Sequence, residues 1–218
     1  MPIRARKILL LDLDGTLVDP APGIIGSARH ALARLGAPAP EDADLRWMIG
    51  PSIRASFARL LGPGGDPEAA VTLYRERYAE WGLREATPYP GIMATLQARA
   101  ADGTRLILCT AKATVFARQV VEHFGFAPLI GAVYGPELDG RFEDKGDLIA
   151  HLLATEGIDP DEACMVGDRE HDVIAAARNG IPTVGVLWGY GGRAELTAAG
   201  AAVLIERPAE LLHGVAGR

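Results

Sequence analysis

The chain has 218 residues, which is long enough for one sizeable core or for a core domain with a smaller second domain. Hydrophobic residues make up 49% and charged residues 23%, a composition typical of a folded protein rather than a disordered one. The net charge of −6, from 22 basic and 28 acidic residues, disfavours a nucleic-acid-binding protein, because such surfaces need a basic excess. A local site on an acidic protein can still be positive, so an anionic metabolite is a compatible partner.

The apolar runs are too short for a membrane span or a secretion signal. The first run, Ile8–Leu11, ends at Asp12, whereas a membrane span needs roughly 18 apolar residues and a signal peptide about 7–15. Cys109 and Cys164 each lie in an apolar run, which predicts two buried free thiols. We therefore expect a cytoplasmic protein that does not bind a membrane.

Taken in chain order, the first predicted strand is Lys7–Leu11, and a long interval without a convincing strand follows it. Helical patterns fill this interval, and proline residues flank it at Pro20 and at Pro88. Stiff proline-containing linkers on both sides predict a helical domain, residues 20–86, inserted into a domain formed by residues 1–19 and 87–218. In the alternative, these helices pack directly on the sheet. The helices expected in the interval are Pro22–Leu35, Ile53–Leu61 and Pro67–Glu85.

After this interval, short apolar runs alternate with helix-length segments. The alternation predicts an α/β fold with a doubly wound, Rossmann-like parallel sheet and helices on both faces. The later strands are expected at Arg105–Cys109, Ala132–Tyr134, Ala163–Val166, Thr183–Leu187 and Ala202–Ile205. The helices between and after them are expected at Ile92–Ala101, Thr114–Phe124, Asp144–Glu156, Glu170–Asn179, Arg193–Ala199 and Pro208–His213.

Acidic and hydroxyl residues come directly after three of the predicted strands, and further charged residues lie on the adjoining helices. Because the carboxyl ends of parallel strands share one edge of a sheet, we expect these side chains to meet there. A single Asp after a strand is usually a turn former or a helix cap, but three such strand ends favour a functional site. The candidates are Asp12, Asp14, Thr110, Lys145, Asp168 and Asp172.

Several carboxylates in one cleft raise each other's pKa or require a cation. Mg²⁺ is a hard ion that binds carboxylate and carbonyl oxygens, so it is the cofactor that this group of residues favours. Mg²⁺ with carboxylates and a lysine is the equipment of phosphoryl chemistry.

Four segments in this order resemble the four motifs of the haloacid dehalogenase superfamily. Asp12–Asp19, with the sequence DLDGTLVD, is similar to the first motif, Thr110 to the second, Lys145 to the third, and Gly167–Asp172, with the sequence GDREHD, to the fourth. The resemblance spans nearly the whole chain. It implies that the inserted helical domain is the family's cap.

The resemblance also implies roles for the candidate residues. Asp12 would be the nucleophile that forms an aspartyl-phosphate, and Asp14 would be the general acid and then the general base, which requires a raised pKa. Thr110 would donate hydrogen bonds to the phosphoryl oxygens, and Lys145 would neutralise negative charge.

Further roles follow from the same resemblance. The metal ligands would be the carboxylates of Asp12 and Asp168 and the backbone carbonyl of Asp14, and Asp172 would support them directly or through a water. Substrate-binding residues would include Gly15, where the backbone must turn sharply, and Ala111.

The second aspartate of the first motif indicates the reaction class. Family members that cleave carbon–halogen bonds do not need a proton donor at Asp14, so its presence favours phosphoryl chemistry. Members that cleave carbon–phosphorus bonds use a cap lysine, whereas the lysines here are Lys7, Lys112 and Lys145. We expect a Mg²⁺-dependent phosphomonoesterase acting on a small phosphorylated metabolite such as phosphoglycolate. A 5′-nucleotidase, a sugar phosphomutase and a non-catalytic metabolite-binding relative are the alternatives.

Substrate specificity is expected to come from the inserted domain. Ile49–Arg54 resembles a segment of phosphoglycolate phosphatase-like proteins, and Tyr74–Tyr78 is similar to the nucleotidase-like group. Arg54 either binds a substrate carboxylate or phosphate or is a surface arginine. Tyr74, Tyr78 and Trp81 share one helical face, which either packs within the domain or stacks on a base. The sequence leaves open whether the protein is a monomer or a homodimer.

Overall fold

The computed structural model describes residues 6–212, and the chain divides into two compact units. One unit contains the described residues up to Asp19 and those from Pro88 onward, and the other is Pro20–Thr87. Two short strands, β2 (Val18–Asp19) and β3 (Thr87–Pro88), carry the chain across this division and pair with each other.

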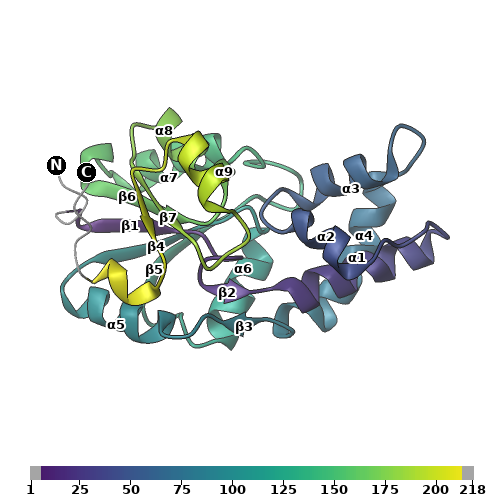
Figure 1. Cartoon of the computed structure of the whole chain (residues 1–218), viewed down its shortest axis with the longest axis horizontal. Helices are drawn as coiled ribbons and strands as arrows, with labels where there is room; N and C mark the ends of the chain where they lie inside the picture. Colours follow the sequence, from purple (N-terminus) through teal and green to yellow (C-terminus); the bar gives the residue numbers. More distant parts are fainter. Residues whose placement is uncertain (1–5, 213–218) are drawn as a thin grey trace. The chain divides into compact units, whose positions relative to one another are not determined.

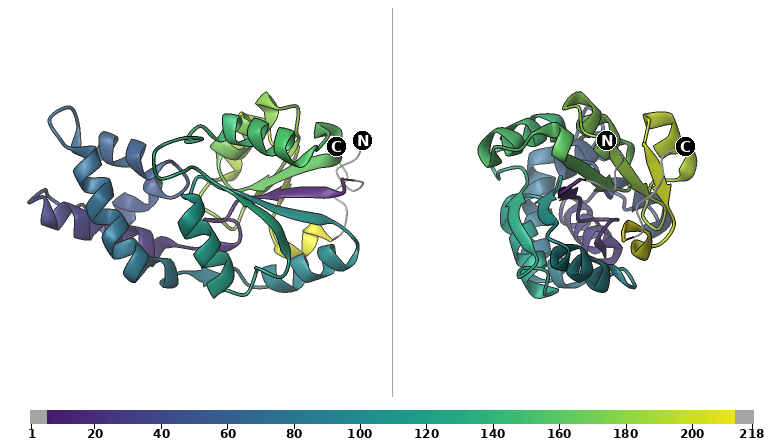
Figure 2. Two further views of the ribbon diagram at one scale, coloured as in Figure 1. Left: turned by 180° about the vertical axis from the view of Figure 1, so that it is seen from behind. Right: turned by 90° about the vertical axis from the view of Figure 1, so that its left-hand side faces the viewer.

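The larger unit contains a six-stranded sheet with the order β5-β4-β1-β6-β7-β8, and every strand pair is parallel. Helices α7 and α8 lie on one side of this sheet, and α5 and α6 lie on the other (Figures 1 and 2). The strands are β1 (Ile8–Leu11), β4 (Arg105–Cys109), β5 (Ile130–Tyr134), β6 (Ala163–Gly167), β7 (Thr183–Val186) and β8 (Val203–Ile205). The helices are α5 (Ile92–Ala101), α6 (Thr114–His123), α7 (Lys145–Glu156), α8 (Glu170–Arg178) and α9 (Arg193–Ala199), with short 3₁₀ turns at Pro160–Glu162 and Pro208–Leu211.

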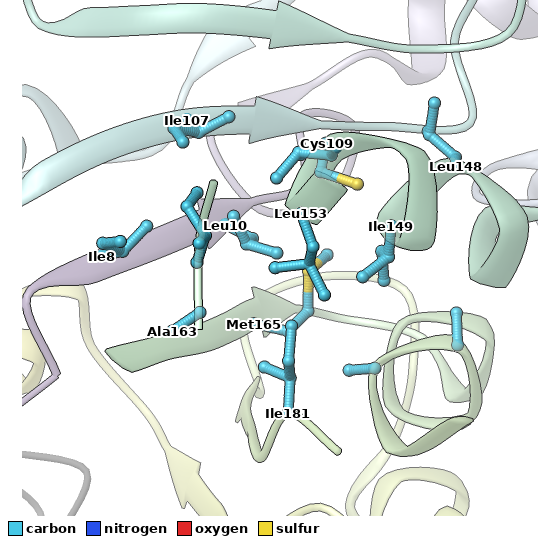
Figure 3. Close-up of a cluster of buried hydrophobic side chains, with 14 residues drawn as sticks. Ile8, Leu10, Ile107, Cys109, Leu148, Ile149, Leu153, Ala163, Met165 and Ile181 are labelled. Carbon is cyan, nitrogen blue, oxygen red and sulfur yellow. The ribbon is translucent and has the colours of Figure 1, made fainter. Parts of the chain in front are cut away.

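The strands are continuous apolar runs because both faces of the sheet are covered. Leu10 pairs with Ile107 on one side and with Met165 on the other, and these side chains share one face with residues of α7 and α8 (Figure 3). Cys109 lies on this same face, while Cys164 alternates to the other. Both cysteines are buried and free, as predicted.

The smaller unit consists of helices and short turns. Its elements are α1 (Ala21–Arg34), α2 (Asp42–Leu45), a 3₁₀ turn at Arg46–Met48, α3 (Ile53–Leu61), α4 (Pro67–Glu80) and a second 3₁₀ turn at Gly82–Arg84. Glycine allows α1 and the second turn to pack closely, since a Cβ atom on Gly23 would lie 2.0 Å from the carbonyl oxygen of Gly82.

The α/β prediction is confirmed, but several boundaries were wrong. The helix predicted over Pro67–Glu85 ends at Glu80, because the close packing around Gly82 requires a change of direction there. The helix predicted over Pro208–His213 is a 3₁₀ turn, and His213 lies outside the described residues. Helix α2 and the two-residue strands β2 and β3 were missed, because such short elements have no periodic pattern.

Candidate active site

The candidate site lies at the carboxyl ends of three neighbouring strands. Asp12 follows β1, the strand at the centre of the sheet, and Thr110 and Asp168 follow its two neighbours, β4 and β6. The sheet order reverses direction at β1, and such switch points are where ligands bind in open α/β sheets. All three side chains are buried, with at most 4% of each residue exposed.

Three carboxylates form one group at this edge. Oxygen atoms of Asp12, Asp168 and Asp172 all lie within 4.8 Å of one another. The Nζ atom of Lys145, at the first turn of α7, lies 2.9 Å from Oδ1 of Asp12 and also donates a hydrogen bond to Asp172. One ammonium group therefore contacts two of the three carboxylates in a site that is almost closed to solvent.

Burial and charge both change the pKa values of these groups. Burial raises the pKa of Asp168 well above its usual range, and the neighbouring carboxylates of Asp172 and Asp12 raise it further. Burial acts to lower the pKa of Lys145, but the negative charges of Asp12 and Asp172 outweigh this effect and raise it. Lys145 therefore stays protonated, whereas Asp168 holds a proton more readily than an ordinary carboxyl group.

Glycine residues make room for two of the carboxylates. Gly15 has a φ of 82°, and a Cβ atom there would lie 2.1 Å from Oδ2 of Asp168. A Cβ atom on Gly167 would lie 2.3 Å from the carboxyl carbon of Asp172. Both distances are far shorter than a van der Waals contact, so only glycine fits at these two positions.

Asp14 has a different partner from the three clustered carboxylates. Its Oδ1 atom lies 2.6 Å from Nζ of Lys112, and both side chains are nearly buried. Burial raises the pKa of Asp14, and the ammonium group of Lys112 opposes that rise. Lys112 was not among the predicted site residues. Its position two residues after Thr110 was the available signal.

The residues after β4 are arranged by short local bonds. The hydroxyl oxygen of Thr110 accepts a hydrogen bond from the backbone N–H of Lys112 at 3.3 Å, and Thr110 is 1% exposed. Ala111 is half-buried between them. The predicted substrate-binding position Ala111 is therefore next to both a buried hydroxyl group and a lysine.

A loop that the sequence analysis missed covers Asp168. Residues 187–192 connect β7 to α9, and the backbone N–H of Tyr190 donates a hydrogen bond to Oδ2 of Asp168 at 2.7 Å. The side-chain N–H of Trp188 donates to the carbonyl oxygen of Thr16 at 3.1 Å. The sequence of this segment, Trp188–Gly192, is rich in glycine and follows a strand whose carboxyl end lies at the same edge of the sheet. This was a usable signal that the loop belongs to the site.

The smaller unit holds the remaining candidates. Arg54, on α3, forms an ion pair with Glu68 of α4. Tyr74 and Tyr78 stack on each other with ring centroids 5.4 Å apart and are buried, so the packing interpretation holds for these two residues. Trp81 is 59% exposed and is not part of that buried stack.

Comparison with known proteins gives the family. The model of the family described as haloacid dehalogenase-like hydrolase matches residues 9–186. The chain belongs to this family. A 5′-nucleotidase from Pseudomonas aeruginosa is 43% identical over 191 residues, which cover 87% of this chain and 86% of that protein. The tyrosine-protein kinase PtkA of Mycobacterium tuberculosis is 40% identical over 190 residues, covering 87% of this chain and 65% of the kinase.

Other relatives and a solved structure agree with the family assignment. Several phosphoglycolate phosphatases match at 30–36% identity. A crystal structure of a predicted phosphatase from Clostridium acetobutylicum superposes with a TM-score of 0.90 at 36% identity, covering 94% of this chain and 96% of that one. The predicted resemblance to the haloacid dehalogenase superfamily and the predicted enzyme class, a phosphatase of this family, are confirmed. Among residues 6–212, no helix has the length and apolar character that crossing a membrane requires.

Proposed function

We propose that this haloacid dehalogenase-like hydrolase is a Mg²⁺-dependent phosphomonoesterase whose nucleophile is Asp12. The observation that supports this most directly is the buried group of Asp12, Asp168 and Asp172 held by Lys145, beside a separate pair of Asp14 and Lys112. The three-carboxylate group is suited to binding a metal ion and to nucleophilic attack by Asp12, and the Asp14–Lys112 pair is suited to proton transfer.

The donor set fits Mg²⁺. Its three groups are carboxylates, the ligands that this ion prefers, and all three are buried. Lys145 balances only part of their charge, so a divalent cation would stabilise the remainder. Asp12 and Asp168 would hold the ion with their carboxylates and Asp14 with its backbone carbonyl, while Asp172 orients Lys145. When bound, Mg²⁺ would neutralise charge on the phosphoryl oxygens.

The chain's own residues would carry out the reaction in two steps. In the first step, a carboxylate oxygen of Asp12 forms a bond to phosphorus, the ester P–O bond breaks, and Asp14 gives its proton to the leaving oxygen. In the second step, Asp14 takes a proton from a water that attacks phosphorus, the bond to Asp12 breaks, and inorganic phosphate leaves. The raised pKa of Asp14 suits the first step, because a general acid must hold its proton near neutral pH.

Other residues would position the phosphoryl group. Lys145 donates a hydrogen bond to Oδ1 of Asp12, so it keeps the nucleophile in place. The Thr110 hydroxyl group is buried beside Asp12's strand and would donate a hydrogen bond to a phosphoryl oxygen. Lys112 holds the carboxyl group of Asp14 through an ion pair.

Among small phosphate monoesters, we propose nucleoside 5′-monophosphates as the first substrates to test. The relative named 5′-nucleotidase is 43% identical, whereas those named phosphoglycolate phosphatase are 30–36% identical. Phosphoglycolate, the substrate type first expected from the sequence, is the second. The cytoplasmic location and the oligomeric state, monomer or homodimer, stay predictions.

The test is phosphate release from a panel of esters with and without Mg²⁺. The panel contains nucleoside 5′-monophosphates, phosphoglycolate, sugar phosphates and p-nitrophenyl phosphate, and Asp12→Asn is the matched inactive variant. Mg²⁺-dependent release that disappears in Asp12→Asn is the expected result. Release that is unchanged in this variant would exclude Asp12 as the nucleophile, and conversion of one sugar phosphate into another without free phosphate would indicate a mutase.

One further arm addresses the relative named as a kinase. Labelled ATP is supplied with a tyrosine-containing peptide, and the label is followed into peptide and into free phosphate. We expect no label on the peptide, with the label either left in ATP or released as free phosphate. Stable label on peptide tyrosine would contradict the phosphomonoesterase assignment.

A further inference from the structure

The loop at residues 187–192 contacts two different parts of the larger unit, and Tyr190 is the residue that joins them. Its backbone N–H donates to Asp168, at the candidate metal site. Its phenol O–H donates to the carboxylate of Asp19. Asp19 is the last residue of the larger unit before the chain crosses to the smaller one.

The same loop also contacts the returning segment of the chain. The Trp188 ring lies 6.4 Å from the ring of Tyr89, measured between centroids, and Tyr89 follows directly after β3. The backbone N–H of Tyr89 donates to the carbonyl oxygen of Leu17 at 3.0 Å, and Trp188 donates to that of Thr16. Both crossings of the chain are therefore attached to one loop.

The loop cannot shift independently of Asp168, because its glycines are packed against that residue. A Cβ atom on Gly189 would lie 2.4 Å from Oδ2 of Asp168 and 2.4 Å from the carbonyl oxygen of Gly15. A Cβ atom on Gly191 would lie 1.9 Å from the carbonyl oxygen of Asp168. A change in the position of Asp168 must consequently move the loop, or be resisted by it.

We infer that Tyr190 is a positioning residue that couples Asp168 to the crossing segments, so that ion binding at Asp168 stabilises the backbone around Asp19. This inference rests on the proposed function, because it takes Asp168 as a metal ligand. The coupling passes through two hydrogen bonds made by one residue, one from its backbone and one from its side chain. Removing the phenol O–H breaks the second bond and leaves the first unchanged.

The experiment is hydrogen exchange of the full chain with Mg²⁺ as the probe. In the wild type, Mg²⁺ slows amide exchange both in peptides containing Asp168 and in peptides covering residues 17–21 and 86–90. In Tyr190→Phe, Mg²⁺ still slows exchange at Asp168, but the effect on the crossing peptides falls by about tenfold or more, the size expected for losing one hydrogen bond to a charged group. Tyr134→Phe is the matched control, because Tyr134 also donates its phenol proton to a carboxylate, that of Glu156.

A second pair of variants changes the other end of the bond. Asp19→Asn keeps an oxygen that accepts the phenol proton, so it should preserve most of the Mg²⁺ effect on the crossing peptides, whereas Asp19→Ala should remove it. Tyr190→Phe combined with Asp19→Ala should lose no more than either single variant, since both remove the same bond.

The outcomes separate this inference from the proposed function. Equal Mg²⁺ effects on the crossing peptides in wild type and Tyr190→Phe would overturn the coupling, and so would a wild type in which Mg²⁺ protects only the Asp168 peptides. No Mg²⁺ effect on any peptide would overturn the proposed metal site together with the inference. An equal loss in Tyr134→Phe would show a general effect of removing a phenol group and would also overturn it.

Discussion

Replacing Gly15 by alanine tests whether the first motif is shaped around Asp168. Gly15 has a φ of 82°, which costs alanine about 1–2 kcal/mol in this left-handed region. Its new Cβ atom would also lie 2.1 Å from Oδ2 of Asp168, and such overpacking costs about 1–3 kcal/mol. The carboxylate must move by roughly 1 Å to relieve the contact, a displacement that can reduce turnover about 100-fold.

A matched control separates backbone strain from the contact with Asp168. Gly103 has a φ of 78°, and a Cβ atom there meets nothing within 4 Å. Gly103→Ala should therefore show the strain alone, with Mg²⁺-dependent activity unchanged. Gly15→Ala should be less stable than this control by about 1–3 kcal/mol, or about 2–4 °C in Tm for each kcal/mol.

The measurements are thermal unfolding and phosphate release from p-nitrophenyl phosphate over a range of Mg²⁺ concentrations. If Gly15→Ala matched Gly103→Ala in both stability and activity, the close packing between the first motif and Asp168 would not constrain the site. Close packing against Asp168 would then not be the reason why glycine occupies position 15.

Three further predictions concern single side chains. Asp12→Asn, which is nearly isosteric, should abolish phosphate release while leaving circular dichroism and Tm close to wild type; retained turnover would exclude the nucleophile assignment. Arg54→Ala should raise KM for the preferred ester more than KM for p-nitrophenyl phosphate, and equal changes would remove Arg54 from the specificity site. Asp144→Ala should cost about 1 kcal/mol, because the Asp144 carboxylate caps α7 by accepting from the N–H of Asp147 at 2.9 Å. That hydrogen bond lowers the pKa of Asp144 below 3.8, so its contribution is present above this pH and is lost as the pH falls through the lowered value; a Tm difference from wild type that stayed constant down to about pH 2 would contradict this.

The positions of the strand-end residues followed from the sequence because two local facts were sufficient. Each apolar run ended at a recognisable residue, and parallel pairing brings strand ends to one edge whatever the length of the connections. Asp12, Thr110 and Asp168 could thus be placed together before any coordinates. The spacing of Asp168 and Asp172 by one helical turn gave the fourth member in the same way.

The side-chain partners of these residues could not be predicted from the sequence, because they depend on three-dimensional distances between residues far apart in the chain. Lys145 was the lysine predicted for the site, and only the structure assigns Lys112 to Asp14. The bond from Tyr190 to Asp19 joins two turns far apart in the chain, and neither residue belongs to a periodic pattern. The end of α4 at Glu80 also depends on a tertiary contact, the close approach of α1 to Gly82.

The central position of β1 has a consequence for biosynthesis. Ile8 pairs with Arg105 on one side and with Ala163 on the other, so the strand made first acquires its neighbours only after most of the chain has been synthesised. The helical unit, Pro20–Thr87, is one continuous segment, so all of it is synthesised before β4 and β6. We therefore expect the helices of this unit to fold during synthesis, while β1 is still an unpaired and exposed apolar strand. At that stage a chaperone would protect the strand from aggregation.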